Sequence, residues 1–214
     1  TYISEPFFRD GVVAKAADQV TALGTAYFSA AGNFGSKTYE STFYPSTAPP
    51  GISGEAHNFA GSIGGNDIYQ SISLTPGNYT VVMQWDDGTP GNFTSSDFDI
   101  YLSKENGSTL FGFNRVNTGG APLEVLPFTV AGDNAQTNFM IIRASGSGSA
   151  LLKYVIFRGD ITINEYATTG GSTLVGQANA EGAIAVGAVL FSNTPEYGVN
   201  PPTAASFSSR GGTT

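Results

Sequence analysis

Cysteine is absent from this 214-residue sequence, and histidine occurs once. The lack of cysteine excludes disulfide bridges, thiolate metal sites and cysteine nucleophiles. Lysine and arginine are also scarce, because nine of them stand against seventeen acidic residues and the formal net charge is −8. A nucleic-acid partner needs a basic patch, which nine scattered cations do not supply, so we expect no nucleic-acid binding.

Long hydrophobic runs are missing as well. The longest, at 182–191, has ten residues, about half of the length that crosses a bilayer as a helix. We therefore expect no membrane span. Charged residues make up only 12% of the chain, and glycine is abundant. Together with the lack of cysteine, this composition is typical of a secreted or cell-surface bacterial protein.

Both ends of the sequence have the pattern of an α/β fold. Apolar residues between 12 and 23 recur at spacings of three and four and predict an amphipathic helix, with Asp10 placed to cap its start and Gly24 its end. The apolar run at 26–31 lacks polar alternation, which is typical of a strand buried on both faces of a parallel sheet. The same pattern returns at 182–189, and 205–209 predicts a shorter strand.

The middle of the sequence has a different pattern, in which short β-type runs alternate with turn signals. This spacing predicts an all-β, jelly-roll-like sandwich of seven or eight strands without a helix. The fold class is therefore mixed: a partial α/β domain at 1–44 and 164–214, interrupted by an inserted β-sandwich at 45–163. We expect strands at 68–74, 79–85, 98–103, 109–113, 123–130, 138–144 and 151–158.

Three blocks in the flanks resemble those of the subtilisin-like serine peptidases (subtilases, S8 type). They are FSAAGN at 28–33, AIAVGA at 183–188 and ASFSSRG at 205–211, in the family's order and after an amphipathic helix. The resemblance implies that Asn33 points its amide into the oxyanion hole, where an N–H donor stabilises the tetrahedral intermediate. It also implies that Ala30 and Gly32 wall the primary specificity pocket. The alternative for Asn33 is an ordinary asparagine turn after a strand.

The family's catalytic triad has no match in the sequence, because the aspartate, histidine and Gly-Thr-Ser nucleophile blocks are all missing. We therefore expect an internal portion of a secreted serine endopeptidase, cut from between the histidine and the serine, that is inactive alone. Its partners would be the remainder of the parent chain and a protein or peptide substrate. His57 lies in a Gly/Pro-rich stretch, and no Gly-x-Ser-x-Gly elbow occurs. We expect it to be a solvated loop residue and not a catalyst.

The middle zone resembles small β-sandwich modules of the prepeptidase C-terminal type (PPC), which are associated with substrate or surface binding and sometimes with calcium. The resemblance rests on IYQSISL at 68–74, PGNYTV at 76–81 and DFDIYL at 97–102. Asp97 and Asp99 lie two apart on one predicted strand and so project from the same face. They are the candidate calcium ligands, although Ca²⁺ takes six to eight oxygens. The alternative is a solvated acidic pair, and we expect no other cofactor.

Two other interpretations of the whole chain stay open. In one, it is a non-catalytic binding or adhesion module on a degenerate peptidase scaffold. In the other, the sandwich recognises protein substrate or a cell-wall polymer while the flanks catalyse. Trp85, the only tryptophan, is either a sugar-stacking platform or a core residue. Because it continues the alternation of Tyr79, Val81 and Met83, we expect it in the core.

Overall fold

The structure is a computed structural model of the chain, and it describes residues 3–61, 63–91, 93–104, 107–108, 110–112, 114–167 and 171–211. The chain forms two compact units. One is Tyr39–Thr168, which we call the sandwich unit. The other combines Thr1–Thr38 with Thr169–Thr214, and we call it the split unit.

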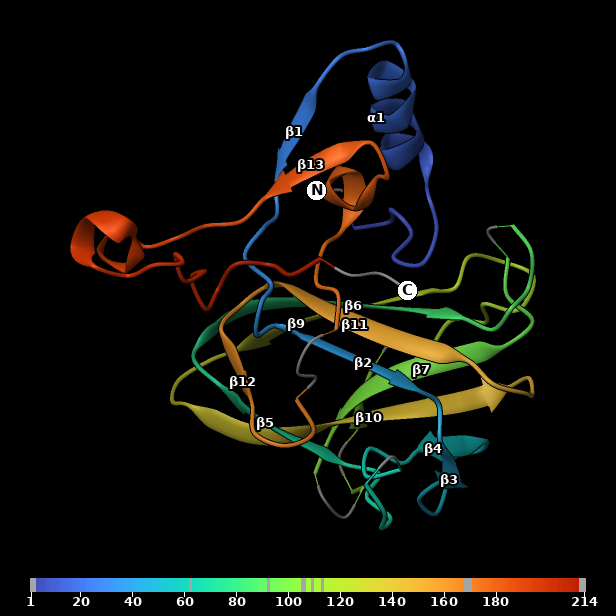
Figure 1. Cartoon of the computed structure of the whole chain (residues 1–214). Coiled ribbons are helices and arrows are strands. Elements are labelled where there is room, and N and C mark those ends of the chain that lie inside the picture. Colours follow the sequence, from blue (N-terminus) through green and yellow to red (C-terminus); the bar gives the residue numbers. More distant parts are fainter. Residues whose placement is uncertain are drawn as a thin grey trace. The chain divides into compact units, whose positions relative to one another are not determined.

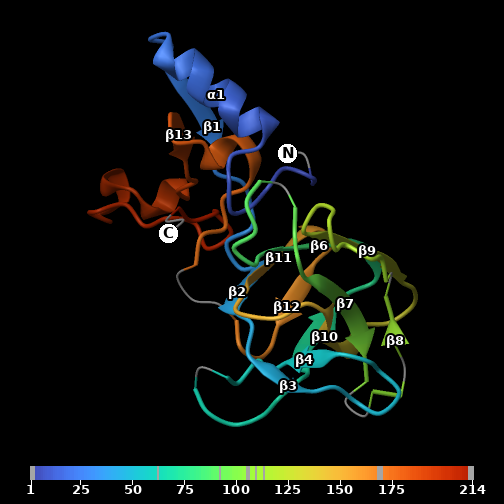
Figure 2. The same ribbon diagram turned by 90° about the vertical axis from the view of Figure 1, so that its right-hand side faces the viewer.

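The sandwich unit consists of two stacked, mainly antiparallel sheets (Figures 1 and 2). The larger sheet has the order β12-β5-β10-β4-β3, with β7 paired to both β10 and β8, and the smaller has the order β2-β11-β6-β9. The described part of this unit is therefore all β, as predicted. The strands are β2 Thr38–Thr42, β3 Pro45–Thr47, β4 Glu55–His57, β5 Gln70–Leu74, β6 Gly77–Asp86, β7 Asp97–Ser103, β8 Leu110–Phe111, β9 Leu123–Val130, β10 Ala135–Ser145, β11 Leu151–Arg158 and β12 Ile161–Ile163.

Large apolar side chains from both sheets form one core between them. Alternate residues of β6 point into it, because successive side chains of a strand face opposite ways. The series ends at Trp85, which is 0% exposed and donates its ring N–H to Thr94 Oγ1 over 2.7 Å. The expectation that Trp85 is a core residue is confirmed, and a sugar-stacking role for it is excluded.

The predicted long strands match β5, β6, β7, β9, β10 and β11 to within three residues. β8 falls inside the predicted strand at 109–113, of which residues 109 and 113 lie outside the described part. Strands β2, β3, β4 and β12 were not predicted, so the sandwich has more strands than the seven or eight expected. Each of them has three to five residues, which is too short to show a period of two.

The predicted domain boundaries differ from those of the structure at both ends. Residues 39–44 belong to the sandwich unit, because β2 lies beside β11 and both Tyr39 and Phe43 are in its core. Residues 164–168 also belong to it. There Tyr166 packs against the same core and donates its hydroxyl hydrogen to Asp67 Oδ2 over 2.9 Å.

The split unit has a helix, α1 (Val12–Ala22), and a parallel pair of strands, β1 (Tyr27–Ala30) and β13 (Ala183–Val186). In the pair, Tyr27 lies opposite Ala183 and Ala30 opposite Val186. Ala14 and Ala17 of α1 form a small cluster with Ala180, Tyr27 and Ala183. Figure 1 shows α1 in blue beside these strands. Three 3₁₀ helices follow the inserted unit: η1 Gly176–Asn179, η2 Phe191–Asn193 and η3 Pro195–Tyr197.

The cap predicted for α1 is wrong at its start. The N-cap is Gly11, without a side-chain cap. The orphan N–H groups of Val13 and Ala14 instead donate to Glu5 Oε1, each over 3.0 Å. At the other end Gly24 has φ +87°, just after the C-cap. This is the left-handed position where helices usually end on glycine.

The apolar surfaces predicted to be buried in the split unit are largely exposed. Phe28 is 65%, Ile184 49% and Val186 53% exposed. On α1, Val12 is 82% exposed, while only Ala14 and Ala17 are buried. The reason is that the described part of this sheet has two strands, and α1 packs on one of its faces. The strand predicted at 205–209 is a turn instead, with an isolated bridge between residues 189 and 204 before it.

Candidate functional site

Asn33 lies just past the carboxyl end of β1, in the turn of residues 32–34. Its side chain is exposed and makes no hydrogen bond within the described ranges. In open α/β sheets, ligands bind at the carboxyl ends of parallel strands. Within the described residues, Asn33 presents an exposed amide without a hydrogen bond close to the carboxyl end of β1.

The three blocks that resemble the peptidase family meet at this turn. The N–H of Ala31 donates to the Val186 carbonyl over 2.9 Å, which joins the first block to the second. The N–H of Ser209 donates to the Gly32 carbonyl over 2.9 Å, and Ser209 Oγ accepts from the Phe34 N–H over 3.0 Å. The third block thus holds the residues on both sides of Asn33.

Ala30 and Gly32, the predicted pocket residues, are neighbours of this turn. Ala30 is the exposed last residue of β1. Gly32 has φ +93°, in the left-handed region, and a Cβ there would lie 3.3 Å from both the Phe34 ring and Ser209 Oγ. The backbone therefore requires glycine at this position. Their role in a specificity pocket stays a prediction.

His57 is not the solvated loop residue that we expected. It ends β4 and is 0% exposed. Nδ1 accepts from the Tyr44 N–H over 3.2 Å, and Nε2 lies 2.7 Å from Tyr39 Oη. Burial lowers the pKa of His57 to about 3, so the ring is neutral. Both ring nitrogens bond within the core, and this histidine has no open side for a substrate.

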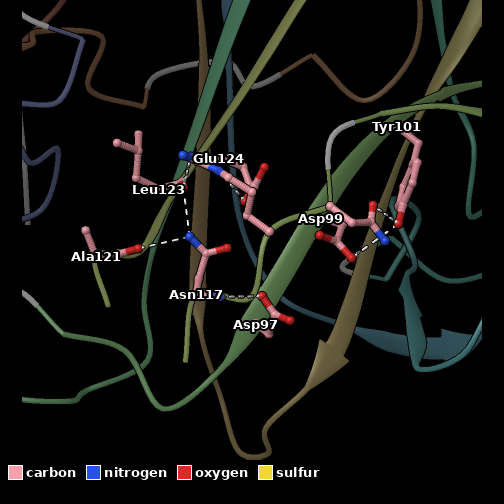
Figure 3. Close-up of polar contacts among 9 residues, drawn as sticks. Asp97, Asp99, Tyr101, Asn117, Ala121, Leu123 and Glu124 are labelled. Atoms are coloured by element: carbon pink, nitrogen blue, oxygen red, sulfur yellow. Dashed lines mark hydrogen bonds and ion pairs between the residues drawn. The ribbon is translucent and has the colours of Figure 1, made fainter. Parts of the chain in front are cut away.

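Asp97 and Asp99 are also not a solvated pair, because they are only 7% and 2% exposed. Asp97 Oδ1 accepts from the Asn117 N–H over 3.0 Å. Asp99 Oδ2 lies 3.2 Å from Tyr101 Oη, which also donates to Asn114 Oδ1 over 2.5 Å. Figure 3 shows Asp97 beside Asn117, and Asp99 beside Tyr101. The two carboxyls therefore have different partners.

A third buried carboxyl, that of Glu124 in β9, was not predicted from the sequence. It is 1% exposed, and its Oε1 lies 3.7 Å from Arg115 Nε. A signal for it existed, because Glu124 is in phase with Leu126 and Phe128 on a strand with period-two alternation. An acidic residue at an apolar phase is a candidate for a buried group.

Asp97, Asp99 and Glu124, with the neighbouring Asn117, form what we call the acidic cluster. Several of its oxygens have no hydrogen-bond partner within the described residues, namely Asp99 Oδ1, Asn117 Oδ1 and Glu124 Oε1. Burial, with the nearby charge of Asp97, raises the pKa of Asp99 to about 6. Burial also raises the pKa of Glu124 to about 8, since Asp99 and Asp97 add to it and Arg115 only partly opposes it. Glu124 is consequently protonated at neutral pH.

The cluster does not form a recognisable metal centre. In the part of the chain that the structure describes, no three or more His, Asp or Glu side chains are grouped so that they could hold a metal ion. Calcium at Asp97 and Asp99 stays a prediction. The same part of the chain has no helix with the length and hydropathy of a membrane span.

Comparisons with known proteins place the chain in no family. No family model and no curated protein matches the sequence. Among solved structures, the chain is similar to a carbohydrate binding module (CBM6cm-2) from Cellvibrio mixtus lichenase 5A in complex with cellotriose. The sequence identity is 15%, the match covers 58% of this chain and 89% of that chain, and the TM-score is 0.31. A TM-score this low does not establish a shared fold.

Proposed function

We propose that the split unit is part of the catalytic domain of a secreted subtilisin-like serine endopeptidase, with Asn33 as its oxyanion-hole donor. The main support for this proposal is the structure of the turn at Asn33. Val186 and Ser209, both from the C-terminal part of the split unit, hold the backbone on each side of Asn33, while its amide is exposed and makes no hydrogen bond within the described residues. An ordinary surface turn needs no such support from distant segments.

The chemistry assigned to Asn33 is charge stabilisation. When a serine hydroxyl attacks the scissile carbonyl, the carbonyl oxygen becomes an oxyanion. The serine, the histidine that takes its proton and the aspartate that orients the histidine would come from the remainder of the parent chain. Asn33 would donate a hydrogen bond from Nδ2 to the oxyanion, and a donor fixed in advance needs no reorganisation in the transition state. The small residues Ala30 and Gly32 would leave room for a substrate side chain.

The exposed apolar surface of the split unit supports its place in a larger α/β domain. Parallel sheets occur almost only where helices cover both faces. Here α1 packs on one face, whereas Phe28, Ile184 and Val186 are exposed. In the proposed peptidase, elements of the parent chain cover these side chains. The parent chain is thus a partner as necessary as the protein or peptide substrate.

We assign the sandwich unit to the prepeptidase C-terminal type, as a module inserted into that domain. This assignment is supported by the separate core of the sandwich unit and by its position in the sequence, between the two parts of the split unit. Its contribution is substrate or surface binding, or structural support. Calcium at Asp97 and Asp99 belongs to the same proposal, and main-chain carbonyls or waters would then complete the six to eight oxygens.

The experiment is Asn33→Ala in the complete parent peptidase, which includes the catalytic triad, assayed on a peptide substrate. We expect kcat to fall by about 10²–10³ with little change in KM, which is the loss already known for removal of the oxyanion-hole asparagine of subtilisin itself. The control is Asn78→Ala, which changes an exposed asparagine of β6 in the sandwich unit that accepts only from Thr129 Oγ1 among the described contacts. The isolated 214 residues should not react with a fluorophosphonate, since the triad blocks are missing. An unchanged kcat in Asn33→Ala, or labelling of the isolated chain, would refute the proposal.

A further inference from the structure

Ser209 binds the chain on both sides of Asn33. Its N–H donates to the carbonyl of Gly32, over 2.9 Å, and its Oγ accepts from the N–H of Phe34, over 3.0 Å. Ser209, which is 175 positions away from Phe34 in the sequence, therefore bonds to both neighbours of Asn33. Ser209 is 7% exposed, so water has little access to replace its hydroxyl.

The space around the turn is equally restricted. At Gly32 a Cβ would meet Ser209 Oγ at 3.3 Å. At Gly35 it would lie 2.5 Å from the Ser208 carbonyl oxygen and 2.6 Å from that of Ser206, closer than real Cβ atoms approach. The backbone of the third block thus lies directly against the turn. The position of Asn33 is therefore determined by contacts of the third block and not by its own side chain.

We propose that Ser209 is a positioning residue that holds the oxyanion donor Asn33 in place, an inference that rests on the proposed function. Among the residues that the structure describes, the Asn33 side chain has no hydrogen-bond partner, so the orientation of its amide depends on the backbone at residues 32 and 34. A displacement of about 1 Å in a catalytic group can cost about 10²-fold in rate. Ser209 therefore acts on kcat, through Asn33, without touching the substrate.

Ser208 supplies a matched control. It is 5% exposed, next to Ser209 in the same turn, and its Oγ also accepts a main-chain N–H, that of Ala188, over 3.0 Å. Its partner follows β13 and is not in the turn of Asn33. The Ser208 hydroxyl also donates to the Ser209 carbonyl over 3.5 Å. Ser208→Ala and Ser209→Ala therefore each remove a partly buried bond from a main-chain N–H to a serine hydroxyl, and only the second removes a bond to residues 32–34.

The experiment is a double-mutant cycle in the complete parent peptidase, with Ser209→Ala, Asn33→Ala and the double variant that carries both substitutions. We expect Ser209→Ala to lower kcat by about 10- to 100-fold with KM unchanged, and Ser208→Ala to leave kcat within about twofold. Ser209→Thr, which retains the hydroxyl, should restore kcat. In the Asn33→Ala background, Ser209→Ala should cause no further loss, because it acts only through Asn33.

The outcomes separate this inference from the proposed function. If Asn33→Ala leaves kcat unchanged, the proposed function fails. If Asn33→Ala is impaired but Ser209→Ala matches Ser208→Ala, or its loss adds fully to that of Asn33→Ala, only the positioning role fails. Should Ser209→Ala not fold, Ser209→Cys, which keeps the size but is a weak acceptor, takes its place in the same cycle with the same expectations.

Discussion

The two units differ in the size of the side chains that they bury. The sandwich unit encloses large aromatic and aliphatic residues, such as Trp85, Tyr154 and Phe139, each 0% exposed. In the described part of the split unit, Phe7 is a large buried side chain, at 1% exposed, but the buried members of two core clusters are alanines and one leucine. Because stabilisation scales with buried apolar area, at about 25 cal/mol per Å², the sandwich unit carries its own stability. We expect the split unit to depend more on hydrogen bonds, such as those of Ser209 with Gly32 and Phe34 and those of Glu5 with the start of α1.

The units also differ in charge. The sandwich unit has twelve acidic and five basic residues, whereas the split unit has five and four. Three of the twelve, Asp97, Asp99 and Glu124, are buried. The excess negative charge thus lies in the sandwich unit, whereas the split unit buries one carboxyl within its described residues, that of Glu5.

The largest effect that we expect is from truncation of that core. Phe139 of β10 packs against Tyr154, with ring centroids 5.0 Å apart. Phe139→Ala should lower the free energy of unfolding by about 3–5 kcal/mol, because it removes buried area and leaves a cavity. Urea unfolding followed by the fluorescence of Trp85 measures it, since this single tryptophan reports on the sandwich unit. A loss below about 1 kcal/mol would contradict the comparison between the units.

The sequence predicted the long strands of the fold, but it did not predict the contacts that form the candidate site. Strands β9 and β11 were predicted with their observed bounds, because period-two alternation over eight residues is a clear signal. Strands β3, β4 and β12 have three residues each and form through pairing with neighbours that no local pattern reveals.

At the candidate site, the three blocks located the Asn33 turn, but the role of Ser209 depends on a contact across 175 residues. The burial of His57 was missed for the same reason. Its partners are Tyr39 and Tyr44, whereas the glycines and prolines near it indicated a solvated loop. Sequence neighbours predict local conformation, while burial is decided by what the fold brings alongside.

A second prediction tests the buried charge of the sandwich unit. In the folded protein Glu124 has a pKa of about 8, whereas an unfolded glutamate has a pKa of about 4.3. The protonated Glu124 side chain therefore stabilises the folded state. This stabilisation is complete below the unfolded pKa and is lost as the pH rises through the folded pKa. Between pH 7 and 8.5 we expect the unfolding free energy to fall by about 1 kcal/mol.

Glu124→Gln should abolish this fall, because glutamine keeps a neutral side chain of the same shape. The window avoids His57 and Asp99, whose folded and unfolded pKa values all lie below 7. Urea midpoints from Trp85 fluorescence at the two pH values provide the measurement. Asp133→Asn, which changes an exposed acid of the same unit, should keep the fall, and a pH-independent wild type would show that Glu124 is not buried as described.

The smallest effect concerns the split unit and its hydrogen bonds. Glu5 Oε1 accepts from the N–H groups of Val13 and Ala14 and so replaces the missing cap of α1. Glu5→Ala should cost the helix start about 1 kcal/mol, the usual value of a cap, and speed amide hydrogen exchange at these two positions about fivefold. Glu181→Ala, at an exposed site of the same unit, should leave both rates unchanged. Equal exchange in both variants would mean that α1 does not depend on this contact, and that the difference between the units lies in core size alone.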